Sequence, residues 1–391
     1  MKKITAFLLC FCLLFGFGTV SFAKNDVKNE AETQSIDKEV NSRSAVLMEA
    51  SSGKILYAKN EPGAYSPASV TKIMTLLIVA EALADGKISP EDNITVSEYA
   101  SSMGGSQVFL KEGESISVEE LIKCTVIASA NDAAVALAEL VAGSEDAFVS
   151  KMNARAMELE LKSTSFENVT GLDDTTVNHV TSALDIAIMS RELIKHEIIL
   201  KYSSVWQDSI RDGEFILTNT NRLVRFYDGC NGLKTGSTDK AGYCMSATAK
   251  RGGMQLIAVV MGAQTRDSRN NIARKLLDYG FANYSLYSLD EEIIKNVPVL
   301  KGTENYVTLY SAPFVDVVDK SNYGKIEKVY NITENVEAPV SEGQVLGSVE
   351  YILNGEKIGE SAVYAKQSVD KINFITLYGK LLRKIFGENR K

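Results

Sequence analysis

The sequence predicts a mixed α+β fold, in which one antiparallel sheet packs against a helical subdomain and a small all-β domain follows. Short apolar runs with strand character stand at both ends of residues 42–284, and the apolar spacing between them is mostly helical. Residues 285–367 are instead rich in Val, Tyr, Ile and Thr, in short runs that Gly, Asn and Asp separate. Because both ends of the first region supply strands, we expect them to meet in one sheet.

The individual elements follow from the period of the apolar residues. We expect strands at 44–48, 55–58, 243–249 and 255–261, and helices at 70–84, 118–129, 133–142, 146–159, 183–194 and 272–279. Turn signals at 51–53 and 251–253 join the strands into hairpins.

Composition limits the class of protein. The chain has 391 residues, of which 45% are hydrophobic and 24% charged, as is typical of a soluble globular protein with more than one domain. These values exclude a disordered chain, a collagen and a polytopic membrane protein. The formal net charge of −8 argues against nucleic acid as a partner.

The first 23 residues have the pattern of a secretory signal peptide. A basic start, an apolar stretch and small residues before a cleavage point after Ala23 predict export, with an uncleaved N-terminal anchor as the alternative. Cys10 lacks the preceding small residue of a lipoprotein signal, so we expect no N-terminal lipid. Residues 24–41 are polar and predict a flexible lead-in.

The C-terminal segment, residues 368–391, is basic and amphipathic. From Lys371 onward it holds six basic residues against Glu388, a net charge of +5. Its apolar residues fall on one helical face: Phe374, Ile375, Tyr378, Leu381, Leu382, Ile385 and Phe386. A basic amphipathic helix predicts an anchor in the membrane surface. The alternative is a helix that packs on the β-domain.

Cysteine and histidine are scarce. Once the signal peptide is removed, Cys124, Cys230 and Cys244 remain, an odd number that excludes a full disulfide framework. Cys230 and Cys244 pair only if their strands are in register, and buried free thiols are the alternative. No cluster has metal-ligand spacing, so we expect no metal and no cofactor. The chain has two histidines, so few residues could serve as the histidine of a Ser-His-Asp triad.

The segment Ser69-Val-Thr-Lys72 is an S-x-x-K motif at a predicted helix start. The pair Ser66-Pro67 favours a first turn here, so Lys72 projects from the same face as Ser69. A buried lysine can lose its proton near neutral pH and act as a base towards a serine hydroxyl.

Two further motifs follow in the chain. Ser129-Ala-Asn131 is an S-x-N where a helical run breaks, and Lys234-Thr-Gly236 is the only K-T-G of the sequence. The K-T-G lies on an apparent edge strand, where Gly232 and Gly236 allow the close approach of a ligand backbone. The three motifs stand in an order that serine acyl-transfer enzymes share.

At these motifs the chain resembles the low-molecular-mass (class C) penicillin-binding proteins, the D-alanyl-D-alanine carboxypeptidases. The likeness also covers further segments of that family: residues 67–75, the loop 105–113, residues 166–172 with His179 and Asp185, and residues 232–242. It implies a penicillin-binding/β-lactamase-like transpeptidase fold for residues 42–284.

The resemblance implies a role for each catalytic residue. Ser69 attacks the peptide carbonyl between two D-alanines and forms an acyl-enzyme, while Lys72 takes its proton. Ser129 relays a proton to the leaving D-alanine, and Lys234 supports it electrostatically. His179 is expected to be structural, because this mechanism has no role for it.

The resemblance also implies the substrate-binding residues. Asn131 holds the substrate amide, and backbone N–H groups of Ser69 and Ser237 form the oxyanion hole. Ser237 stands where relatives often carry His, which puts the substrate preference in doubt. Ser106 and Gly236 belong to the same predicted site.

The terminal carboxylate of the substrate needs a cation. The resemblance implies Thr235 and an arginine as its ligands. Arg269 is our choice and Arg266 is the rival, and the sequence does not separate them.

The implied substrates are peptidoglycan stem pentapeptides that end in D-Ala-D-Ala, with removal of the last residue in cell-wall maturation. β-Lactam antibiotics would be covalent inhibitors. The implied location is the outer face of the cytoplasmic membrane, through the C-terminal helix.

Three alternatives remain at this point. A serine β-lactamase shares the motifs, and Glu167 lies near the position of its deacylating Glu, but the following residues differ and the β-domain has no place in it. A D,D-endopeptidase would share every motif. A non-catalytic wall-binding protein would have no use for a serine with two lysines.

Overall fold

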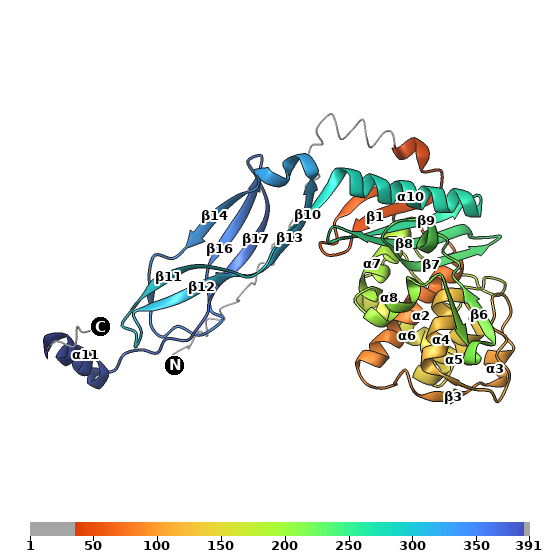
Figure 1. Cartoon of the computed structure of the whole chain (residues 1–391), viewed down its shortest axis with the longest axis horizontal. Coiled ribbons are helices and arrows are strands. Elements are labelled where there is room, and N and C mark those ends of the chain that lie inside the picture. The colour runs from red at the N-terminus through yellow and green to blue at the C-terminus, as the bar shows by residue number, and fades with distance from the viewer. Residues whose placement is uncertain (1–35, 387–391) are drawn as a thin grey trace, which may run out of the picture.

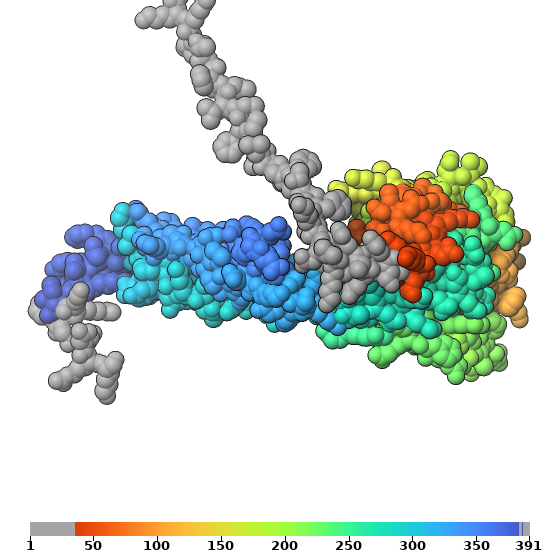
Figure 2. Space-filling view, turned by 90° about the horizontal axis from the view of Figure 1, so that it is seen from above, coloured from red at the N-terminus to blue at the C-terminus, as the bar shows by residue number. Residues whose placement is uncertain are grey.

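The computed structural model describes residues 36–386. The predicted signal peptide, the first part of the lead-in and residues 387–391 lie outside this range. Figure 1 shows an elongated molecule with a mixed α/β unit (residues 36–283) at one end and a β-domain (residues 284–371) beside it. A short helix, residues 374–386, lies at the end of the β-domain that is far from the mixed unit (Figure 1), and Figure 2 shows the same blue segment at that end of the molecule.

The mixed unit is built on an antiparallel sheet. Its strands are β1 (Ser44–Glu49), β2 (Ile55–Lys59), β7 (Cys230–Thr238), β8 (Gly242–Arg251) and β9 (Met254–Ala263). Their order in the described chain is β2-β1-β9-β8-β7, and β1 pairs with β9 along its whole length. The two ends of the unit therefore meet in one sheet, which confirms the predicted fold class. Strand β7, which carries the K-T-G motif, lies at an edge.

Both faces of the sheet are covered. On β1, Val46 and Met48 face the core of the helical subdomain, whereas Ala45 and Leu47 face a second core under helix α10 (Arg266–Asn283). Successive side chains of a strand point to opposite faces, so a strand that is covered on both sides is apolar throughout. This explains why β1 reads as a continuous apolar run.

The helical subdomain lies between β2 and β7 in the chain. Its helices are α2 (Lys72–Ala84), α3 (Glu98–Ser101), α4 (Val118–Lys123), α5 (Asn131–Ala142), α6 (Glu145–Glu158), α7 (Ala183–Leu193), α8 (Glu197–Ser203) and α9 (Leu223–Phe226). Two short ribbons accompany them: β3 (Asn93–Thr95) with β4 (Ser115–Ser117), and β5 (Gln207–Ile210) with β6 (Phe215–Thr218).

Two helices differ from the sequence prediction. The helix expected at 118–129 changes after α4 into a π-helical turn, Cys124–Ala128, which the apolar spacing does not distinguish from an α-helix. Helix α10 begins at Arg266 rather than at 272. Its first turn is polar and shows no apolar period. The residue before it, Thr265, caps the helix, because its side chain accepts a hydrogen bond from the Ser268 N–H.

The last part of the predicted lead-in belongs to the folded unit, which corrects the expected boundary at residue 41. Ile36 and Val40 are buried, and the Tyr57 hydroxyl donates to Asp37 Oδ1 at 2.8 Å. Two apolar residues four apart in a polar stretch form one helical turn against the second core.

The three described cysteines are buried and free. The register of β7 with β8 places Cys230 opposite Ala249 and Cys244 opposite Gly236. Cys230 and Cys244 are thus five residue pairs apart along the ladder, and the disulfide considered from the sequence does not form.

The β-domain has its own core. Its strands are β10 (Tyr284–Leu289), β11 (Glu292–Leu300), β12 (Tyr306–Ser311), β13 (Phe314–Asp319), β14 (Glu327–Ile332), β15 (Val336–Glu337), β16 (Val345–Leu353) and β17 (Glu356–Ala365). The strands from β11 to β17, except β13, form one sheet with a separate cluster of buried residues, and β10 pairs with β13. Val369 is buried in this cluster and Lys371 bridges to Gly302, so the β-domain extends past the predicted end at 367.

Helix α11 (Phe374–Phe386) follows the β-domain and exposes large apolar side chains. Phe374 is 80% exposed and Ile375 is 82% exposed, so this face does not pack on the β-domain. In the part of the chain that the structure describes, no helix has the length and apolar character needed to cross a membrane.

Candidate active site

A cavity of about 590 Å³ lies beside the edge strand β7. Of the residues singled out in the sequence, it is lined by Ser69, Ser106, Ser129, Thr235, Gly236, Ser237, Arg266 and Arg269. Lys72, Asn131 and Lys234 are buried behind this lining, where they contact one another or the serines. The three motifs, which are far apart in the chain, therefore meet at one place.

Ser69 lies in a 3-10 turn just before α2, rather than in the first turn of the α-helix. The preceding residue, Ala68, adopts a φ of 50°, and the Thr71 hydroxyl donates to its carbonyl at 2.9 Å. His179 Nε2 lies 2.7 Å from the Thr71 oxygen, while His179 Nδ1 accepts the N–H of Glu167 at 3.0 Å. The Nε2 atom must then carry the proton and donate to Thr71.

His179 thus supports the turn that presents the nucleophile and does not line the cavity. Burial lowers the pKa of His179 to about 4, so the ring is neutral at physiological pH.

Lys72 has the geometry of a base. Its Nζ lies 3.1 Å from Ser69 Oγ, 2.5 Å from Asn131 Oδ1 and 2.9 Å from the Thr170 carbonyl oxygen. The last two atoms only accept hydrogen bonds, so they take the two N–H groups of a neutral amine and leave its lone pair towards Ser69. Burial is the main cause that lowers the pKa of Lys72 to about 7.

The second lysine contacts the second serine. Lys234 is fully buried, and its Nζ donates to Ser129 Oγ at 2.7 Å and to the Thr235 carbonyl at 2.8 Å. Burial lowers the pKa of Lys234 well below its usual value, and the positive charges of Lys72 and Arg269 lower it further. Ser129 ends the π-helical turn with a φ of 64°.

Gly236 lets the edge strand approach the nucleophile. A Cβ atom on Gly236 would lie 2.7 Å from the backbone N of Ser69 and 2.8 Å from that of Val70. Real Cβ contacts of this length are essentially absent, so the position requires glycine. Gly232 was expected to serve the same purpose, but its neighbours are Ser203 and Thr248 and it does not line the cavity.

The two candidate arginines differ in burial. Arg269 is buried, with Nε and Nη2 donating to Asn270 Oδ1 at 3.1 and 3.0 Å, whereas Arg266 is exposed. Burial lowers the pKa of Arg269 to about 10, which leaves the guanidinium cationic at neutral pH. Both arginines line the cavity, and Arg269 supplies it with a buried cation.

Sequence reasoning missed part of the wall. Arg222, Thr220 and Trp206 also line the cavity, and the Thr235 hydroxyl donates to the Thr220 hydroxyl oxygen at 2.8 Å. These residues lie in the connections just before β5 and between β6 and α9, where there is no apolar periodicity. The signal that could have found one of them is that Trp206 is the single tryptophan of the chain.

The loop that carries Ser106 is tied to the S-x-N motif. The Asn131 N–H donates to the Ser106 carbonyl at 2.7 Å, and Asn131 Nδ2 donates to the Gly104 carbonyl at 2.6 Å. The latter bond identifies Nδ2 as the donor, so the Oδ1 atom of the same amide faces Lys72. Asn131 therefore orients the base.

Comparisons with known proteins agree with this geometry. Residues 28–265 match the family described as D-alanyl-D-alanine carboxypeptidase, and residues 281–371 match the penicillin-binding protein 5 C-terminal domain. The chain is 44% identical over 384 residues to D-alanyl-D-alanine carboxypeptidase DacF of Bacillus subtilis, covering 96% of this chain and 97% of that one.

Two solved structures extend the comparison. Penicillin-binding protein 5 of Haemophilus influenzae is 34% identical with a TM-score of 0.76, over 85% of this chain and 98% of that one. Penicillin-binding protein D2 of Listeria monocytogenes, in the ampicillin-bound form, is 31% identical with a TM-score of 0.56, over 61% of this chain and 97% of that one. From its cavity and these relatives together, the chain belongs to the D-alanyl-D-alanine carboxypeptidase family of low-molecular-mass penicillin-binding proteins.

Proposed function

We propose that this chain removes the terminal D-alanine from peptidoglycan stem pentapeptides through an acyl-enzyme on Ser69. The observation that carries the proposal is the placement of Lys72, whose Nζ lies 3.1 Å from Ser69 Oγ and is oriented by two acceptors. A base in hydrogen-bond reach of a serine is the requirement for acyl transfer. The name of the Bacillus subtilis relative supports the same activity.

The proposed reaction assigns each group a step. Ser69 Oγ bonds to the carbonyl carbon between the two D-alanines, and its proton passes to Lys72. The developing oxyanion accepts hydrogen bonds from the Ser69 and Ser237 N–H groups. The C–N bond breaks as a proton reaches the leaving nitrogen through Ser129, which Lys234 contacts. Water then hydrolyses the ester.

The substrate carboxylate completes the proposed complex. Thr235 and Arg269 would bind it, since both line the cavity and Arg269 is a buried cation. Arg222 adds positive charge to the same wall. Among the described residues, those that line this cavity include no carboxylate, which favours an anionic ligand.

We also propose that β-lactams acylate Ser69 and leave slowly. The ampicillin-bound Listeria relative supports the acylation. The residue that suggested a β-lactamase, Glu167, points away from this chemistry: its carboxylate accepts the N–H groups of Val177 and Asn178 at 2.8 and 2.9 Å, and it does not line the cavity. No base at that position is then available to hydrolyse the acyl-enzyme.

The test of the activity is D-alanine release from a diacyl-Lys-D-Ala-D-Ala tripeptide. The wild-type protein is expected to release D-alanine, and Ser69→Ala to lose at least about 10³-fold of the rate, because the nucleophile is gone. Thermal unfolding of both proteins checks that the variant is folded. Equal release by the two proteins would refute Ser69 as the nucleophile.

We propose further that the protein is exported, that residues 1–23 are removed, and that helix α11 binds the outer face of the cytoplasmic membrane. The support is the exposed apolar face of α11 together with the net charge of +5 from Lys371 onward. An amphipathic helix of this kind lies in the plane of the interface and does not span it.

A truncation tests the anchor. The last backbone contact before α11 is the Ile372 N–H to the Lys301 carbonyl, so the truncated protein ends at Ile372. We expect the full-length protein to sediment with vesicles that contain anionic lipid and the truncated protein to stay in the supernatant. Sedimentation of both proteins would place the membrane contact elsewhere, and D-alanine release by both checks their folding.

A further inference from the structure

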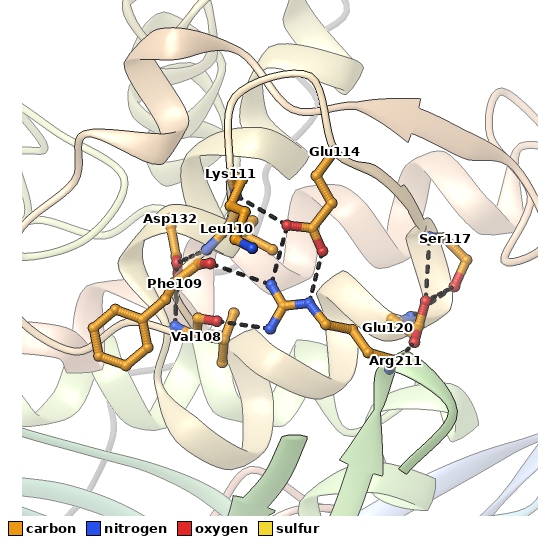
Figure 3. Close-up of polar contacts among 9 residues, drawn as sticks. All are labelled: Val108, Phe109, Leu110, Lys111, Glu114, Ser117, Glu120, Asp132 and Arg211. Carbon is orange, nitrogen blue, oxygen red and sulfur yellow. Dashed lines mark hydrogen bonds and ion pairs between the residues drawn. The ribbon is translucent and has the colours of Figure 1, made fainter. Parts of the chain in front are cut away.

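Arg211 lies outside the cavity and yet binds the loop that forms one of its walls. Its guanidinium makes a two-pronged contact with Glu114, with Nε to Oε1 at 2.7 Å and Nη2 to Oε2 at 3.1 Å. The remaining N–H groups donate to the backbone carbonyls of Val108 at 3.0 Å and Phe109 at 3.3 Å (Figure 3). One side chain thus ties the middle and the end of residues 104–114, here called the Ser106 loop.

The opposite edge of the same loop is bound to helix α5. The buried Asp132 carboxylate accepts the N–H groups of Val108 and Leu110, each at 3.1 Å (Figure 3). In residues 108–110, two backbone carbonyls thus accept hydrogen bonds from Arg211, and two backbone N–H groups donate to Asp132. The Ser106 loop is held between two charged groups that come from distant parts of the chain.

The loop in turn fixes the amide of Asn131. Its Gly104 and Ser106 carbonyls accept the Nδ2 and backbone N–H groups of Asn131. If the loop shifts, the Asn131 amide loses the partner that keeps its Oδ1 on Lys72. The contacts therefore run from Arg211 through the loop to Asn131 and the base.

We propose that Arg211 is a positioning residue for the acylation of Ser69, acting through the Ser106 loop. The proposal rests on the proposed function, because it needs Ser69 to be acylated. Arg211 itself sits in a strained turn: it and Asp212 adopt φ values of 53° and 54°. Its backbone N–H donates to Glu120 Oε1 at 2.8 Å, so the turn is anchored to α4 (Figure 3).

The experiment compares Arg211→Met with a matched control, Arg155→Met. The Arg155 side chain also forms ion pairs, with Glu81 and Glu158, and it is 27% exposed against 24% for Arg211. It lies on α6 and makes no contact with the Ser106 loop in the described structure. Both variants lose a partly exposed ion pair, and Arg211→Met also loses the two hydrogen bonds to the carbonyls of the Ser106 loop, which is the difference under test.

The readout is the time course of labelling by a fluorescent penicillin over a range of concentrations. It separates the first-order acylation step from the initial binding. We expect Arg211→Met to slow the acylation step about 10- to 100-fold, because a displacement of about 1 Å at a reacting group has effects of this size. Arg155→Met should acylate at the wild-type rate. Equal acylation by the two variants would overturn the proposal.

Two further variants test the proposal if Arg211→Met does not fold. Glu114→Gln weakens the clamp while leaving Arg211 in place, and it should slow acylation in the same direction. The double variant, Arg211→Met with Glu114→Gln, should acylate no more slowly than Arg211→Met alone, because both changes remove the same Arg211–Glu114 contact. Additive losses would show that Arg211 does not act through this clamp. If the wild-type protein is not labelled at Ser69 at all, the proposed function fails first.

Discussion

Replacing Lys72 with methionine is expected to slow acylation of Ser69 by about 10²- to 10⁴-fold, the usual contribution of a general base. Methionine keeps the length of the buried side chain and removes the amine that lies 3.1 Å from Ser69 Oγ. Asn131 Oδ1 and the Thr170 carbonyl lose their donor, while the cost of burying an amine is also removed. The measurement is the rate of covalent labelling by a fluorescent penicillin.

The pH dependence of the wild-type rate provides an independent check. Below a pH of about 7 Lys72 is protonated and cannot accept the Ser69 proton, so acylation should rise with pH through the Lys72 pKa of about 7 and then level off. The control for the Lys72→Met variant is Lys87→Met, which should be acylated at the wild-type rate. Lys87 lies on the surface beyond the other end of α2 and pairs only with Asp85 in the described structure. A Lys72→Met protein that keeps a tenth or more of the rate would exclude Lys72 as the base.

Gly171→Ala is expected to lower both the stability of the protein and its acylation rate. Gly171 has a φ of +83°, and a Cβ atom there would lie 1.9 Å from the Ala68 carbonyl oxygen and 2.7 Å from Thr71 Oγ1. The backbone of the turn before Ser69 would have to move. The left-handed φ and the overpacking together should cost about 2–5 kcal/mol. The measurement is the free energy of unfolding in urea.

Gly143→Ala separates the two causes. Gly143 has a nearly identical φ of +82°, at the end of α5, but a Cβ atom there would meet nothing within 4 Å. This variant should lose only the backbone cost of about 1–2 kcal/mol and acylate normally. If both variants lose the same stability, the contact between Gly171 and Ala68 is not the cause.

The parts of the fold that follow from local patterns could be predicted from the sequence. Strands β1 and β9 are continuous apolar runs, and helices such as α2 and α7 have apolar residues at helical spacing, because each packs on a core. The motif residues lie at the start of α2, at the break before α5 and on the edge strand β7, and the structure brings these three places together at one cavity. The roles given to Ser106, Ser237 and Arg269 stay predictions.

The features that could not be predicted depend on contacts between segments that are distant in the sequence. Arg211 and Val108 are 103 residues apart, and no local spacing indicates that they meet. The Thr71–His179 contact joins residues 108 apart in the same way. The π-helical turn before Ser129 was missed for a different reason, because its apolar spacing is the same as that of an α-helix. The start of α10 was missed because its polar first turn has the pattern of a loop.

Trp206 gives the molecule a built-in optical signal. It is the only tryptophan of the sequence and lies in the wall of the cavity, with Phe226 at 6.3 Å between ring centroids and Arg225 over its ring at 5.4 Å. Light at the red edge of protein absorption excites this one indole, so the emission of the whole chain is that of a single site. Occupancy of the cavity can therefore be followed by intrinsic fluorescence, without a label and without a contribution from the β-domain.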